Sequence, residues 1–120
     1  MLLKRSTKIM TATTAGRPNM AIVKIKYAPS YIFVMGKEGA DKVRKTLVEY
    51  PNFYGKESKL FVVEGTGKKA AEEVFDLTNN PARDNERDIV YGNGPSLSSG
   101  DIVVVGTEQW LCCAMGWELL

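Results

Sequence analysis

The residues best suited to recognition chemistry lie close together between residues 78 and 92. Arg83 and Arg87 stand four positions apart, after Asn79 and Asn80 and before Tyr91. A guanidinium presents its N–H donors in a planar fork that matches a carboxylate or a phosphate. These five residues predict a binding surface for an acidic protein segment or a phosphate group.

The same segment also has a structural interpretation. Asn80 before Pro81 is typical of a helix N-cap followed by proline at the first helical position, which predicts a short helix from residue 81 to about residue 91. On that helix Arg83 precedes Glu86 by three residues, and an ion pair at this spacing contributes only about 0.2–0.5 kcal/mol. A solvated helix face carrying such pairs is therefore the alternative to a recognition surface.

The composition argues against catalysis. The chain has no histidine, so Ser-His and Cys-His nucleophile pairs and histidine-ligated zinc are excluded. Carboxylates at Asp84, Glu86, Asp88 and Asp101 could bind a divalent cation through oxygen. Three of the four alternate with arginines, however, and are expected to neutralise them. We therefore expect a protein that is not an enzyme and uses no cofactor and no metal.

Gly65-Thr66-Gly67-Lys68 invites comparison with a phosphate-binding loop. A Walker loop requires glycine five residues before its Gly-Lys pair and Ser or Thr after the lysine, where this chain has Val62 and Lys69. The glycines instead predict a turn from a strand into a helix that runs to about residue 77.

A second functional hypothesis is a binder of nucleic acid or of a small anionic ligand such as a nucleotide. Aromatic rings can stack on bases while cations contact phosphates, and the candidates are Tyr54, Trp110, Lys24, Lys26, Arg83 and Arg87. The charge distribution argues against it: residues 1 to 19 hold four basic residues and no acid, which leaves 12 basic and 14 acidic residues in the remainder. A phosphate-binding domain usually shows the opposite excess.

The hydrophobic pattern predicts an α+β fold with a small, mainly antiparallel, curved sheet or partial barrel and one or two packed helices. Ala21, Val23, Ile25 and Tyr27 alternate with Ile22, Lys24 and Lys26, as in a half-buried strand. An amphipathic helix is expected over residues 37 to 50, where apolar residues recur at spacings of three and four. Strands are predicted at residues 20 to 27, 31 to 35, 59 to 64, 101 to 106, 109 to 114 and 117 to 120. Residues 52 to 58 are read as a loop with two exposed aromatic side chains, Phe53 and Tyr54.

Residues 1 to 19 lack acid and clear periodicity, so we expect an N-terminal extension followed by one domain over residues 20 to 120. No apolar run approaches the roughly 18 residues that a membrane span requires. The adjacent Cys112 and Cys113 have no other cysteine to pair with in the chain, which favours a reducing, cytoplasmic location. Successive strand residues point to opposite faces, so one cysteine should enter the core and the other should face outward or toward another layer.

The C-terminal part resembles a known family. The residues that carry this likeness are Thr78-Asn79-Asn80-Pro81, Glu86-Arg87, Tyr91-Gly92-Asn93-Gly94, the stretch Ser96-Leu97-Ser98-Ser99-Gly100-Asp101 with the β-branched run after it, and the end from Trp110 to Leu119. Over about residues 74 to 120 they resemble the YodL-like domain of phage, plasmid and integrated-element proteins. Pro95 departs from the pattern, where a basic residue is expected. The resemblance implies an accessory role in a mobile genetic element and brings no catalytic residues.

The sequence therefore predicts a small non-catalytic accessory protein that binds and modulates a host protein, with nucleic acid or an anionic small molecule as the alternative ligand and no membrane contact. The expected binding residues are Asn79, Asn80, Arg83, Arg87, Tyr91, Tyr54 and Trp110. Its oligomeric state stays open.

Overall fold

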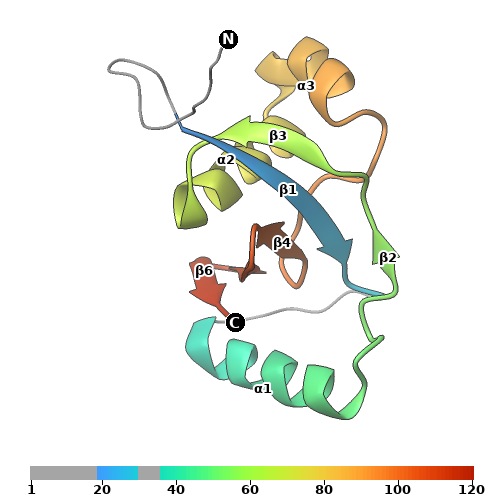
Figure 1. The fold of residues 1–120 in the computed structure, drawn as a ribbon, viewed down its shortest axis with the longest axis vertical. Coiled ribbons are helices and arrows are strands. Elements are labelled where there is room, and N and C mark those ends of the chain that lie inside the picture. The colour runs from blue at the N-terminus through green and yellow to red at the C-terminus, as the bar shows by residue number, and fades with distance from the viewer. Residues whose placement is uncertain (1–18, 30–35) are drawn as a thin grey trace, which may run out of the picture.

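The computed structural model describes residues 19–29 and 36–120, and within them it shows an α+β fold (Figure 1). Its strands are β1 (Met20–Tyr27), β2 (Lys56–Glu57), β3 (Phe61–Glu64), β4 (Ile102–Val105), β5 (Glu108–Cys113) and β6 (Gly116–Leu119). Its helices are α1 (Gly36–Glu49), α2 (Gly67–Asn79), the 3-10 turn η1 (Pro81–Arg83) and α3 (Asp84–Val90). The predicted fold class is confirmed: one antiparallel sheet that does not close into a barrel, with packed helices.

The sheet is organised around β1. The strand order is β2-β1-β4-β5-β6, and β3 also pairs with β1. Val23 has a partner in β3 and another in β4, while Lys26 has one in β2 and another in β4. Strands β2 and β3 therefore lie along the same side of β1, opposite β4, and form a broken edge strand between them.

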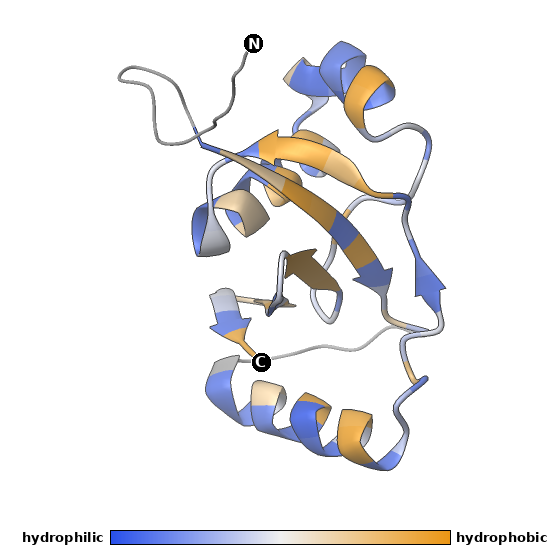
Figure 2. Ribbon diagram, in the orientation of Figure 1, coloured by the Kyte–Doolittle hydropathy of each residue, from blue (hydrophilic) through white to orange (hydrophobic). Residues whose placement is uncertain are grey.

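Helices cover both faces of the sheet. Under α2 the buried residues include Val23, Phe61 and Val103, whereas under α1 they include Ile102 and Leu111. Because Ile102 and Val103 are neighbours in β4, the two clusters lie on opposite faces. In the orientation of Figure 2, the hydrophobic strands β1 and β3 cross in front of α2, and β4 lies between α2 and α1.

The two cysteines illustrate this arrangement. Cys112 lies in the cluster under α2 and Cys113 in the cluster under α1, and both are buried. The prediction that they point to opposite faces is confirmed, and the second cysteine faces another layer rather than solvent. Burial raises the pKa of the Cys112 thiol to about 12, so this group is protonated at neutral pH.

Most predicted elements are confirmed, with shifts of one or two residues at their ends. The expected strand at residues 59 to 64 begins only at Phe61, and the expected short helix begins as the 3-10 turn η1. Strand β2 was missed because Lys56 and Glu57 are polar and too few to show a pattern. The strand expected at residues 31 to 35 lies outside the described residues, as do residues 1 to 18 of the extension expected over residues 1 to 19.

Across residues 19–29 and 36–120, no helix combines the length and the apolar character needed to cross a bilayer.

Candidate functional site

Arg83, at the end of η1, is held by three carboxylates. Its Nη2 lies 2.6 Å from Glu73 Oε2 and 2.8 Å from Glu86 Oε2, and its Nη1 lies 2.8 Å from Asp76 Oδ2. The hydrogen bonds that Arg83 donates to Glu86, Glu73 and Asp76 raise the pKa of the guanidinium above its ordinary value. The predicted ion pair with Glu86 is confirmed. Because Glu73 and Asp76 belong to α2 and Glu86 belongs to α3, Arg83 links the two helices. Its guanidinium is therefore used for contacts within the chain.

Arg87 has a different structural task. Its Nη1 donates to the carbonyl oxygen of Thr78 at 2.8 Å, and its Nη2 donates to the carbonyl oxygen of Gly94 at 2.7 Å. The guanidinium carbon also lies 5.7 Å from the ring centroid of Tyr91. Arg87 thus ties the C-terminal end of α2 to the loop that follows α3, and its guanidinium makes these contacts within the chain rather than projecting freely toward a ligand.

The two asparagines also serve the local fold. Asn79 Nδ2 donates to the carbonyl oxygens of Phe75 and Leu97, each at 3.0 Å. Asn80 Oδ1 accepts a 3.0 Å hydrogen bond from the backbone N–H of Ala82, as predicted for the residue that caps the next helix. Both amides therefore stabilise the turn between α2 and α3.

Tyr91 is a core residue, because only 4% of its surface is exposed. Its hydroxyl donates to the carbonyl oxygen of Pro95 at 2.6 Å, so the 2.5 Å contact with the hydroxyl of Tyr27 is a hydrogen bond donated by Tyr27. Burial raises the pKa of Tyr91 above its ordinary value. Tyr91 was expected to contact a ligand at the surface, but it instead packs inside the molecule.

Tyr54 corrects a second expectation. The side chain was predicted to be exposed and able to stack on a base, but it is 5% exposed. Its hydroxyl donates a short hydrogen bond to the carbonyl oxygen of Gly100. Burial, and then the nearby Asp101, raise the pKa of Tyr54 to about 12. Phe53 is half-buried, with its ring edge-on to Tyr54 at a centroid distance of 5.7 Å.

The Ser-Leu-Ser-Ser-Gly-Asp stretch also has a structural role. The buried carboxylate of Asp101 accepts hydrogen bonds from the backbone N–H of Ala28 at 2.8 Å and of Ser98 at 3.0 Å. The carboxylate therefore holds the end of β1 against the turn that leads into β4.

The proposed phosphate-binding set is not assembled as a free surface. Lys24 Nζ lies 2.9 Å from Glu57 Oε1, and Lys26 Nζ donates to Gln109 Oε1 at 3.0 Å. Trp110 is half-buried against the cluster under α2, and its Nε1 donates to Glu108 Oε1 at 3.0 Å. The described cations of this set are therefore engaged with partners of this chain.

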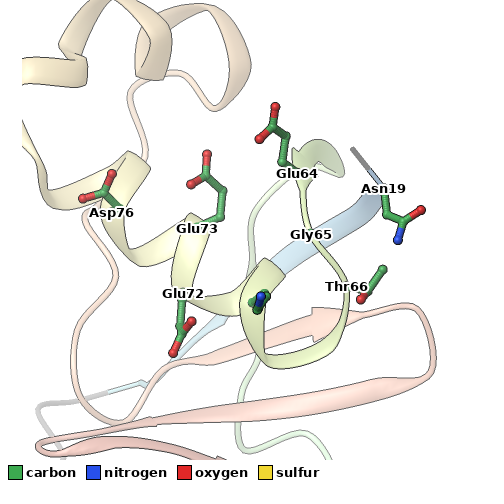
Figure 3. Close-up of a pocket in the computed structure, with 8 residues that line it drawn as sticks. Asn19, Glu64, Gly65, Thr66, Glu72, Glu73 and Asp76 are labelled. Carbon is green, nitrogen blue, oxygen red and sulfur yellow. The ribbon is translucent and has the colours of Figure 1, made fainter. Parts of the chain in front are cut away.

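A hollow of about 740 Å³ opens along α2, from the turn before the helix to Asp76 (Figure 3). Four of the residues that line it are acidic and only Lys69 is basic; the full lining is Asn19, Glu64, Gly65, Thr66, Lys69, Glu72, Glu73 and Asp76. This charge opposes phosphate, in agreement with the interpretation of Gly65 to Lys68 as a strand-to-helix turn. Gly65 has φ +104°, which favours glycine there.

An exposed apolar patch that the sequence patterns did not reveal lies on β1, β3 and the residue before β3; it is formed by Met20, Ile22, Leu60 and Val62. These side chains are 55%, 63%, 65% and 48% exposed. Ile22 lies directly opposite Val62 in the β1–β3 ladder, so the two share one face, and Met20 shares it by alternation. The signal in the sequence was the isoleucine in the otherwise polar row Ile22, Lys24 and Lys26.

The patch is exposed because α1 covers only part of this face. Residues Val23 and Phe61 point to the other face, beneath α2, so the patch lies on the α1 side of the sheet. Helix α1 packs on β5 and β6, at the opposite end of the sheet from β3 (Figure 1). Ile22 and Val62 are therefore neighbouring exposed apolar side chains on a part of this face that α1 does not cover.

Comparison of the chain with protein-family models, with curated proteins and with solved structures gives no match.

Proposed function

We propose that this chain is a small, non-catalytic protein-binding module, and that it acts as an accessory protein of a mobile genetic element by binding and modulating a host protein. The observation that carries the binding function is the exposed apolar patch of Met20, Ile22, Leu60 and Val62. The mobile-element role comes from the resemblance of residues 74 to 120 to the YodL-like domain.

The patch has the character of the centre of a protein interface. Contiguous exposed apolar side chains on a folded domain mark contact sites, and the fully buried centre of an interface is depleted of charge. Charged residues surround the patch, with Glu64 at one end of β3 and the Lys24–Glu57 pair near the other. An apolar centre within a charged rim favours a partner with a complementary apolar surface.

The charges give less support to a nucleic-acid or nucleotide ligand. Arg83 is neutralised by three carboxylates, and Lys24 is paired with Glu57. If the ligand were bound through its phosphates, the affinity should fall steeply as the salt concentration rises. A mainly apolar interface should instead be little affected by salt.

The test is to change Ile22→Lys in the full chain and compare partner capture from a host lysate with that of the parent protein. Val48→Lys is the matched control, because Val48 is 83% exposed on α1, away from the patch. We expect Ile22→Lys to abolish capture and Val48→Lys to retain it, with circular dichroism unchanged in both.

Equal capture by both variants would contradict the assignment of the patch. Capture that falls steeply with added salt, or that nuclease treatment of the lysate removes, would favour the nucleic-acid alternative.

A further inference from the structure

We propose that two copies of this chain pair through the outer edge of β3 and form one continuous sheet with two apolar patches side by side. The evidence for this pairing is the geometry of the outer edge of β3. Only its consequence, a doubled docking surface for the partner, rests on the proposed function.

Hydrogen-bond parity shows which backbone groups of β3 face outward. The N–H of Gly65 donates to the carbonyl oxygen of Asn19 at 2.7 Å, in register with the β1–β3 ladder. Hydrogen-bonded and non-bonded pairs alternate along an antiparallel ladder. Phe61 and Val63 therefore bond to β1, whereas Val62 and Glu64 direct their N–H and C=O groups away from it.

The other edge of the sheet is guarded. The N–H of Leu120 donates to the carbonyl oxygen of Gln109, so by the same alternation Leu119 in β6 faces outward. Arg44 of α1 donates to that outward carbonyl oxygen at 2.6 Å. Proteins commonly cover or charge an edge strand to prevent uncontrolled pairing. Arg44 covers the β6 edge in this way. Within the described residues, β3 pairs only with β1, so no strand lies along its other edge.

A second copy fits this edge by antiparallel, two-fold pairing. In this register Val62 of one copy lies opposite Val62 of the other. The outward N–H and C=O groups of Glu64 in each copy then lie opposite Leu60 of the other copy. The same rotation brings the exposed Glu64 of each copy toward the exposed Lys59 of the other copy, whereas Lys24 stays paired with Glu57. Opposite charges thus meet at both ends of the joint, and a parallel arrangement would lack this match.

Edge pairing leaves the apolar patch open and enlarges it. Ile22 and Val62 point out of the sheet plane, while the pairing groups lie within it. The patches of the two copies meet along β3 and become one surface. Extended edge pairing is also a common mode of recognition between proteins, so the edge and the face are separate sites with separate tests.

The first experiment measures the mass of the full chain by sedimentation over a range of concentrations. We expect the parent mass to rise from one chain toward two with concentration. Val62→Pro should remain a monomer, because proline removes an outward N–H without removing a bond to β1. Leu119→Pro is the matched control at the guarded edge and should dimerise like the parent.

A second measurement needs no variant. Amide exchange of Val62 and Glu64 should slow as concentration rises, while exchange of Phe61 and Val63 should be slow throughout. A parent that stays monomeric, or unchanged dimerisation of folded Val62→Pro, would overturn the proposal, as would concentration-independent exchange at Val62 and Glu64.

Ile22→Lys separates the two proposals. We expect this variant to dimerise normally and to lose partner capture. Loss of its dimer would overturn edge pairing in favour of face-to-face packing, whereas a normal dimer that still captures the partner would overturn the function assigned to the patch and leave the dimer standing.

Discussion

Replacing Asp101 with alanine tests the role assigned to the Gly-Asp turn. The carboxylate accepts hydrogen bonds from the backbone N–H groups of Ala28 and Ser98, and its residue is only 5% exposed. In Asp101→Ala both donors lose their acceptor. The end of β1 and the entry into β4 then lose the side chain that links them.

The expected loss follows from these two bonds. A hydrogen bond to a charged group is worth about 1.5–3 kcal/mol, which applies to the half-buried Ala28. Ser98 is exposed, so water can replace most of its bond, and roughly 0.5–1 kcal/mol is lost there. Asp101→Ala should therefore lower the free energy of unfolding by about 2–4 kcal/mol, a large part of the 5–15 kcal/mol typical of a domain.

The assay is urea unfolding followed by circular dichroism, with the slope against denaturant compared between variants. Asp88→Ala is the control, because Asp88 is an exposed aspartate on α3, and its loss should change stability by less than about 0.5 kcal/mol. If Asp101→Ala is as stable as Asp88→Ala, the carboxylate does not hold the two strands, and the turn owes its shape to the backbone alone.

Two further predictions concern buried titratable groups. Tyr54 has a folded pKa of about 12 against an ordinary value of 10.0, so it contributes stability that is complete below pH 10 and is lost as pH rises toward 12. Urea unfolding at stepped alkaline pH should show this decline, and Tyr54→Phe should make it shallower without abolishing it, because the pKa values of Tyr91 and Cys112 are also raised; an identical slope in the variant would refute the assignment. Cys112 and Cys113 are both buried, and the raised pKa of Cys112 keeps its thiol protonated. Ellman's reagent should therefore label the native protein slowly and the urea-unfolded protein rapidly, and fast labelling of the native state would contradict the burial of these thiols.

The fold was largely predictable because its main elements carry local patterns. The alternation around Val23 and Ile25 defined β1, and the three- and four-residue spacing through Ala40 and Val43 defined α1. The apolar run Leu60-Phe61-Val62-Val63 was different, because apolar residues at successive positions do not reveal which face is covered. Only the placement of α1 and α2 shows that Phe61 and Val63 are buried while Leu60 and Val62 are exposed.

The candidate site was less predictable because its contacts join residues far apart in the chain. Arg83 was correctly paired with Glu86, three residues away, but its bonds to Asp76 and Glu73 cross from one helix to another. The bond from Ala28 to Asp101 spans 73 positions. Spacing in a sequence predicts contacts along one helix or strand and does not report such pairs.

The distribution of polar contacts explains why the arginines serve the fold. Neither η1 nor α3 has a fully buried residue, so hydrophobic packing alone cannot hold this part of the chain in place. Arg83 and Arg87 supply the missing attachment through carboxylates and backbone carbonyls, since charge-assisted bonds are the stronger ones.

Ile22 and Val62 present the opposite case. Their exposed apolar surface gains little from folding and contacts water at a cost of about 25 cal/mol per Å². A partner surface that covers these side chains would recover that free energy, which is why the function is placed on the apolar patch rather than on the arginines.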